Sequence, residues 1–409
     1  MTSEPANSAA GLAVDKTYHN VIILGAGASA DAGIPLLRSF VDTMWEYATR
    51  GKVGETSIPD SDRKILTAAK EIWRELEPYN SRASFDNRNL EDILSLLSLE
   101  ALAGGESAER YNAVVRAVAR TIELSCTINY VEGTPKEPFQ QGGVYHAFWT
   151  QLLNGTQAQN LPALITFNYD LVLERSLWRF FHHLDNPRSD VHVNSCGLRY
   201  CFGENDFSLK GVPHEYRLNR GGQLTRIENG RKANYVWNEA TEADIPYFKL
   251  HGSLNWSQDN PQVRPPTHPT MAVEKPLILP PVFNKMSTGA VNILWKRALE
   301  ALRTAKHIII VGYSLPKTDI YMQYFLKAAV GPNSDLQKVI VFDPVLFKEG
   351  EQADQMRSRY QECFSPQFSN RIVFNPACHF LNRGTLKGSF THFVEALQAR
   401  PNKDLLFYP

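Results

Sequence analysis

Two side chains capable of catalysis, a histidine and an asparagine, each follow a short apolar run of this sequence. His251 stands in "KLHGS" directly before a glycine, so its imidazole can project from a tight turn and accept a proton at neutral pH. Asn168 stands in "TFNYD", where the alternation of a strand sends Thr166, Asn168 and Asp170 to one side. A structural histidine, and a helix cap at Asn168 or Asp170, are the alternatives to a catalytic site.

The segment "VIILGAGASADAGIP", residues 21–35, is typical of a turn that holds the phosphates of a nucleotide. Glycine there permits a tight turn and the close approach of a pyrophosphate to a helix N-terminus. Ser29 and Asp31 add polar groups, and Gly-Ile-Pro at 33–35 ends the helix early, so the next residues loop over the ligand. The acid that a dehydrogenase places about 20 residues further on is missing. A tight turn without a ligand is the alternative. The pattern Gly-x-Gly-x-x-Ala is formed by Gly25, Gly27 and Ala30.

Two later apolar runs also end in polar residues. In "VGYSLPKTD", Gly312 lets the backbone approach a ligand, and Ser314 can donate to a phosphate or a ribose. Asp319 is equally well explained as the cap of the next helix. In "VFDP", Asp343 can accept hydrogen bonds from ribose hydroxyls or can simply end a strand before a proline.

The elements that must position these residues are short β-branched runs, apolar on both faces, with helical patterns after most of them. Such runs are typical of a parallel sheet covered by helices on both sides. We therefore predict an α/β fold with a Rossmann-like, doubly wound parallel sheet, whose ligands bind at the carboxyl ends of the strands. The predicted strands span residues 20–27, 163–170, 247–256, 307–314, 338–344 and 371–377.

Uneven spacing of these runs predicts two insertions in one catalytic domain over residues 19–409, behind a disordered leader at 1–18. A large helical insertion is predicted at about 36–150, and a smaller, irregular β-containing insertion at about 183–245. In "NRNLEDILSLL", an apolar face is expected to pack on the core, and the insertion can cover the ligand pocket as a lid. That face consists of Leu90, Ile93, Leu94 and Leu97.

Composition narrows the class of protein. The 43 basic and 43 acidic residues balance, which gives no reason to expect nucleic acid as a direct ligand. An uninterrupted apolar run of about 18 residues, as a transmembrane helix needs, is missing from the sequence. Five scattered cysteines favour reduced thiols in a cytoplasmic protein, and their spacing makes a zinc site unlikely, so we predict no metal.

Taken in order, four of these motifs resemble those of the sirtuin family. "GAGASADAGIP" is similar to the family's Gly-Ala-Gly-x-Ser-x-x-x-Gly-Ile-Pro, and "TFNYD" to its Thr-Gln-Asn-Ile-Asp. "KLHGS" resembles the catalytic His-Gly of the family, and "VGYSL" its Gly-Thr-Ser-Leu. Four motifs in the same order are far more specific than any one of them, although they leave both insertions uncovered.

The resemblance implies that the ligand is NAD, used as a substrate. His251 is then the general base on a ribose hydroxyl, and Asn168 holds the nicotinamide ribose or the attacking water. Asp170 contacts the nicotinamide carboxamide, and Asp343 binds the adenosine ribose. The resemblance further implies that the pyrophosphate is held by Gly25, Ala26, Gly27 and Ser29. Asp31, Ile34 and Pro35 are implied to close over the nicotinamide half. Thr166 at the strand end, and Gly312 and Ser314 on the adenosine side, are the remaining implied cofactor-binding positions.

Departures from the family narrow the expected activity. The paired cysteines that deacylases carry between His-Gly and Gly-Thr-Ser are missing from 253–311, and Phe167 and Tyr169 replace the family's Gln and Ile. The chain instead resembles stand-alone sirtuin-like effectors of bacterial antiphage defence. That implies an NAD⁺ hydrolase producing nicotinamide and ADP-ribose, a homo-oligomer controlled by assembly with a HerA-type hexameric ATPase. A deacylase or ADP-ribosyltransferase, and a non-catalytic scaffold or sensor, are the alternatives.

Overall fold

The computed structural model describes most of the chain, in thirteen segments. Most of the predicted leader and much of the second insertion lie outside the described residues. The thirteen described segments are residues 18–128, 143–153, 161–184, 197–202, 207–210, 216–218, 224–226, 236–239, 244–257, 270–279, 289–317, 319–375 and 388–399.

A nine-stranded sheet forms the centre of the molecule, in the order β15-β14-β13-β1-β4-β10-β5-β6-β9. The strands from β15 to β5 run parallel to their neighbours, and β6 and β9 are antiparallel. The predicted α/β fold with a parallel sheet is therefore confirmed. In sheet order the strands are Ile372–Phe374, Lys338–Phe342, His307–Val311, Asn20–Leu24, Ala163–Thr166, Ile245–Lys249, Leu198–Tyr200, Phe207–Lys210 and Val236–Glu239.

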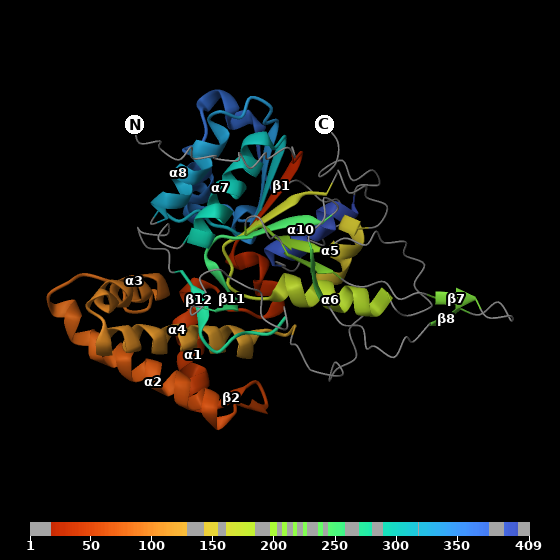
Figure 1. The fold of residues 1–409 in the computed structure, drawn as a ribbon. Helices are drawn as coiled ribbons and strands as arrows, with labels where there is room; N and C mark the ends of the chain where they lie inside the picture. Colours follow the sequence, from red (N-terminus) through yellow and green to blue (C-terminus); the bar gives the residue numbers. More distant parts are fainter. Residues whose placement is uncertain are drawn as a thin grey trace, which may run out of the picture.

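Burial explains why these runs are apolar throughout. β1 lies between β13 and β4, and its residues Val21, Ile22 and Ile23 have no exposed surface. Helices α5 (Val144–Leu153), α6 (Val172–Leu184) and α10 (Ser389–Gln398) pack together on one side of the sheet. Helices α7 (Gly289–Thr304) and α8 (Ile320–Val330) lie on the other side (Figure 1). After β14, a 3-10 turn at Pro344–Phe347 leads into α9 (Glu351–Gln361).

The segment after β1 forms a bundle of helices beside one end of the sheet (Figure 1). It consists of α1 (Leu37–Arg50), α2 (Asp60–Leu76), α3 (Leu90–Glu100) and α4 (Gly105–Ser125), with a small β2–β3 hairpin (Lys52–Val53 and Thr56–Ser57). The predicted apolar face of α3 is buried in this bundle. Helix α5 packs on the sheet side instead, against α6 and α10.

The second insertion contributes to the central sheet, because β5, β6 and β9 extend its edge beyond β10. A further hairpin, β7–β8, spans Tyr216–Leu218 and Leu224–Arg226. The predicted strand at 247–256 is in fact two: β10 ends at Lys249, and β11 (Gly252–Ser257) leaves the sheet to pair with β12 (Pro276–Ile278). The helices in the described segments are all too short or too polar to cross a bilayer.

Candidate active site

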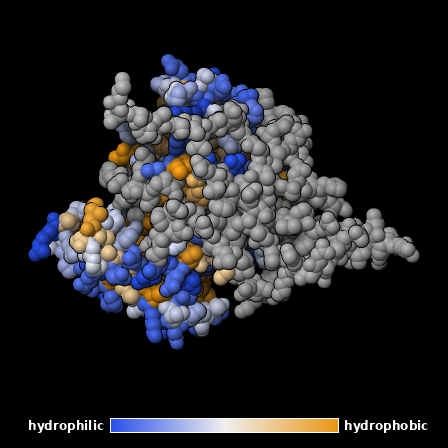
Figure 2. All heavy atoms as spheres, in the orientation of Figure 1, coloured by the Kyte–Doolittle hydropathy of each residue, from blue (hydrophilic) through white to orange (hydrophobic). Residues whose placement is uncertain are grey.

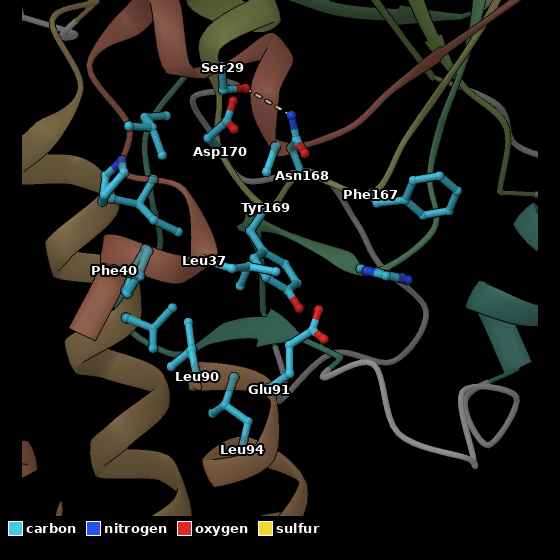
Figure 3. Close-up of a pocket in the computed structure, with 16 residues that line it drawn as sticks. Ser29, Leu37, Phe40, Leu90, Glu91, Leu94, Phe167, Asn168, Tyr169 and Asp170 are labelled. Carbon is cyan, nitrogen blue, oxygen red and sulfur yellow. Dashed lines mark hydrogen bonds between the residues drawn. The ribbon is translucent and has the colours of Figure 1, made fainter. Parts of the chain in front are cut away.

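A pocket that is partly open to solvent lies where the carboxyl ends of β1, β4 and β10 meet the helical bundle. Helices α1, α3 and α4 close it from the other side with apolar side chains, including Phe40, Leu90 and Leu94 (Figure 3). The sequence-predicted residues that the fold brings together here are Ala26, Ser29, Ile34, Pro35, Asn168, Asp170 and His251.

The side chain of Asn168 is fixed by hydrogen bonds to the glycine turn. Its amide nitrogen donates to the carbonyl of Gly25 at 2.8 Å and to the hydroxyl of Ser29 at 2.9 Å (Figure 3). A carbonyl can only accept, so the amide nitrogen must face Gly25, which leaves the amide oxygen for a ligand. Within the described part of the chain that oxygen has no hydrogen-bond partner.

Thr166 helps to fix the backbone of Asn168 and does not line the pocket. Its hydroxyl donates to the carbonyl of Leu24 at 3.2 Å and accepts from the backbone N–H of Asn168 at 3.1 Å. The structure therefore places Thr166 outside the pocket lining, whereas Asn168 and Asp170 are part of it. Strand β4 ends at Thr166, so the alternation stops before the next two motif residues.

Asp170 lines the pocket and also orders the start of α6. Its carboxylate accepts from the backbone N–H of Val172 at 3.0 Å, so the capping interpretation also holds. Burial raises the pKa of Asp170 above its ordinary value, while the charge of Lys249 and the Val172 N–H oppose that shift. The carboxylate is thus desolvated and held in place before any ligand arrives.

A buried ion pair that sequence reasoning missed lies beneath Asp170. Lys249 in β10 donates to the carboxylate of Glu174 at 3.0 Å, and neither side chain has exposed surface. Lys249 also donates to the backbone carbonyl of Asp170, and the hydroxyls of Tyr200 and Tyr247 donate to Glu174 at 2.8 and 3.4 Å. The pair ties the end of β10 to the start of α6. Its signal in the sequence is a lone lysine in the apolar run "IPYFKL".

His251 lies in the turn between β10 and β11 and is 7% exposed. Three rings surround its imidazole: Phe167 at 5.1 Å, and Tyr169 and Trp295 at 6.3 Å between ring centroids. The next residue, Gly252, has a φ of +89°, and a Cβ there would come within 2.1 Å of a β12 carbonyl. Glycine is required at that position for the turn to dock on β12, which aims the imidazole at the pocket.

The glycine turn after β1 packs directly on the turn after β13. The N–H of Gly25 donates to the carbonyl of Val311 at 3.0 Å, and that of Gly27 to Gly312 at 2.8 Å. A Cβ on Gly312, whose φ is +64°, would lie 2.4 Å from the backbone nitrogen of Ala28. These glycines therefore let the two turns approach each other closely, but their own backbone N–H groups already donate to backbone carbonyls. The exposed Ala26 N–H makes no hydrogen bond within the described segments.

The structure places Asp31 away from the pocket. Its carboxylate accepts from the backbone N–H of Thr391 at 2.9 Å, at the N-terminus of α10. A Cβ on the neighbouring Gly388 would lie only 1.7 Å from that carboxylate, so the contact is tight. Asp31 therefore stabilises the packing of α10. This geometry does not favour the predicted contact between Asp31 and the nicotinamide half.

The residues predicted for the adenosine side lie at the ends of β13 and β14, outside the pocket. Ser314 is exposed, and Gly312 is buried in the turn described above. Asp343 accepts from the backbone N–H of Val345 at 2.9 Å, and burial raises its pKa. Asp319 caps α8 through the N–H of Met322 at 3.1 Å, as the alternative interpretation predicted. A group of three or more His, Cys, Asp or Glu side chains suited to a metal is not found in the described segments.

Part of the chain is similar to a known protein family. Residues 162–362 match the model of the SIR2-like domain family. No curated protein is significantly similar to the chain. Among solved structures, Sir2Tm bound to a propionylated peptide aligns over 94% of this chain and 93% of that one, with 11% identity and a TM-score of 0.29. The domain match contains the turns of Asn168 and His251. Residues 162–362, just under half of the chain, are therefore similar to the SIR2-like domain family.

Proposed function

We propose that the chain cleaves NAD⁺ at the nicotinamide–ribose bond with water as the acceptor, releasing nicotinamide and ADP-ribose. The observation that carries the proposal is the convergence of Asn168, Asp170 and His251 in one pocket. They come from two motifs about 80 residues apart and meet beside the glycine turn. A turn for binding alone needs no base, whereas bond cleavage does.

The residues present fit a dinucleotide. Glycines bring the backbones of the turns after β1 and β13 into direct contact, and a glycine turn of this kind lets a pyrophosphate approach the backbone closely. The N–H of Ala26 is a donor in the pocket lining beside that turn, while the buried hydroxyl of Ser29 accepts from Asn168 and hydrogen-bonds Asp170. Asp170 is an acceptor for the amide group of nicotinamide, placed deeper in the pocket.

The chemistry needs positioning, a base and a dry site. Nicotinamide leaves NAD⁺ as a neutral molecule, so positive charge develops on the ribose as the bond breaks. The amide oxygen of Asn168 accepts a hydrogen bond from a ribose hydroxyl or from the attacking water. His251 takes a proton from a ribose hydroxyl, and the rings of Phe167 and Trp295 exclude bulk water around its imidazole.

Water is favoured over an acylated lysine because the bundle covers the pocket. Phe40, Leu90, Leu94 and Ile122 form an apolar wall from three helices where a peptide would need an open groove. A deacylase or an ADP-ribosyltransferase would require α3 to move aside. A scaffold that binds NAD without turnover is the remaining alternative.

The biological setting belongs to the proposal and is supported by the sequence resemblance. We propose a cytoplasmic NAD-depleting effector of antiphage defence, working as a homo-oligomer with a HerA-type hexameric ATPase. Activity of the isolated chain is then low. Figure 2 shows an apolar patch over the end of α3, where Leu99 and Leu102 are 65% and 83% exposed, and this patch is a candidate contact.

Product analysis tests the proposed function. The full chain is incubated with NAD⁺, alone and with the candidate ATPase, and the products are separated by chromatography. Nicotinamide and ADP-ribose in equal amounts support a hydrolase. Nicotinamide release only with an acetylated peptide would favour a deacylase, and NAD⁺ binding with no product under either condition would favour the scaffold.

A further inference from the structure

A carboxylate from the helical bundle shares the pocket with Asn168 and His251. Glu91, in the first turn of α3, lines the pocket, and its carboxylate lies beside the hydroxyl of Tyr169 (Figure 3). No sequence motif singles out this residue. It comes from a segment outside the SIR2-like match at 162–362.

The start of α3 is built to hold Glu91 in place. The side chain of Asn89 caps the helix by accepting from the backbone N–H of Glu91 at 3.0 Å, and its amide donates to Asp92 at 3.2 Å. Asp92 in turn accepts from the backbone N–H of Asp86 at 3.0 Å. These contacts anchor the first turn of α3.

The charge pattern of the pocket suits a developing cation. Its lining holds two carboxylates, Glu91 and Asp170, and contains neither lysine nor arginine within the described residues. The charge of Glu91 also acts on the hydroxyl groups of two nearby tyrosines. After burial, which is the larger cause, Glu91 helps to raise the pKa of Tyr169 well above its ordinary value, and it contributes in the same direction at Tyr313.

Hydrolysis releases a proton that a pocket group must accept from water. The Asn168 amide is neutral and cannot take it, and His251 is assigned to the ribose hydroxyl. Asp170 already accepts from a backbone N–H and is nearly fully buried. Glu91 is half-buried and lines a pocket that is partly open to solvent, so it can accept a proton and pass it to solvent.

We propose that Glu91 is a catalytic carboxylate contributed by the helical insertion and acts as the general base on the attacking water. The oxygen of that water forms a bond to the ribose carbon as the bond to nicotinamide breaks. The bonding electron pair leaves on the nicotinamide nitrogen, and the water proton goes to Glu91 and then to solvent. The inference rests on the proposed NAD⁺ hydrolysis and makes α3 part of the active site.

The test compares two substitutions at Glu91 with a matched control. Glu91→Gln keeps the shape but removes the base, so the kcat for nicotinamide release should fall about 100-fold or more. The affinity for NAD⁺ should change by less than about threefold, since the base acts on water. Glu71→Gln changes an exposed glutamate of α2 that forms an ion pair with Arg74, and it should leave kcat unchanged.

Chemical rescue separates catalysis from a structural role. In Glu91→Ala, added formate should restore nicotinamide release, and azide should yield an ADP-ribosyl azide detectable by mass spectrometry. Wild-type kcat in Glu91→Gln, or loss of activity that neither anion rescues, would overturn the role of Glu91 while NAD⁺ hydrolysis by the wild type stands. A wild type that releases no nicotinamide, with or without the ATPase, would overturn the proposed function and this inference together.

Discussion

Replacing Lys249 with methionine should destabilise the fold and disturb the site, because it leaves a buried carboxylate without its cation. Glu174 has no exposed surface, and after the substitution the hydroxyls of Tyr200 and Tyr247 are the donors that remain to it among the described residues. The backbone carbonyl of Asp170 also loses the lysine donor. The end of β10, two residues before His251, then loses its tie to α6.

The size of the effect follows from the burial of both partners. Removing one member of a buried ion pair costs about 3–5 kcal/mol. Unfolding entropy of about 2.1 cal/mol/K per residue makes each kcal/mol worth about 1 °C in a chain of this length, so Tm should fall by about 4–6 °C. The double substitution Lys249→Met with Glu174→Leu removes both charges and should cost clearly less than the sum of the two single changes.

Thermal unfolding of the wild type, both single variants and the double variant measures this coupling. Nicotinamide release should stay low in the double variant even where Tm recovers, because the tie between β10 and α6 is still missing. A Tm for Lys249→Met within about 1 °C of the wild type, or strictly additive effects in the double variant, would refute the reasoning.

Three further predictions concern the turn and the buried acid. Gly312→Ala should lower both Tm and NAD⁺ affinity, because its methyl would meet the nitrogen of Ala28 at 2.4 Å. Gly54→Ala, at a φ of +56° with nothing within 4 Å, should cost only about 1 kcal/mol and spare activity. Because the folded-state pKa of Asp170 is raised, wild-type stability falls as pH rises from the ordinary value of 3.8 through the folded value. Asp170→Asn should therefore gain Tm relative to the wild type as pH rises, while losing nicotinamide release; a gain independent of pH would contradict this. Tyr145→Phe removes the 2.7 Å hydrogen bond to the Ala28 carbonyl and should cost about 1 kcal/mol and raise KM for NAD⁺ more than it lowers kcat.

Local pattern was sufficient to predict the pocket floor and the strands of the sheet other than β5, β6 and β9. Strands buried on both faces leave continuous apolar runs, so β1, β4, β13 and β14 are visible in the sequence. Parallel strands bring their carboxyl ends to one edge, so Asn168 and His251 could be expected to meet there.

The missed features depend on contacts between distant segments. Asp31 bonds Thr391, a partner 360 positions away, and its neighbours in the sequence give no sign of it. Lys249 and Glu174 are 75 positions apart, and either alone resembles an ordinary surface charge. Glu91 reaches the pocket only because the bundle packs over the sheet edge, which helical periodicity cannot locate.

We propose that Asn168 and His251 form the centre of a site that cleaves NAD⁺. The decisive measurement is the rate of nicotinamide release from NAD⁺ in the wild type, Asn168→Ala and His251→Ala, under the same activating condition and with folding verified by thermal unfolding. We expect release by the wild type and a loss of about 100-fold or more in each variant that still folds. Folded variants that release nicotinamide at the wild-type rate would rule out this role for the two residues.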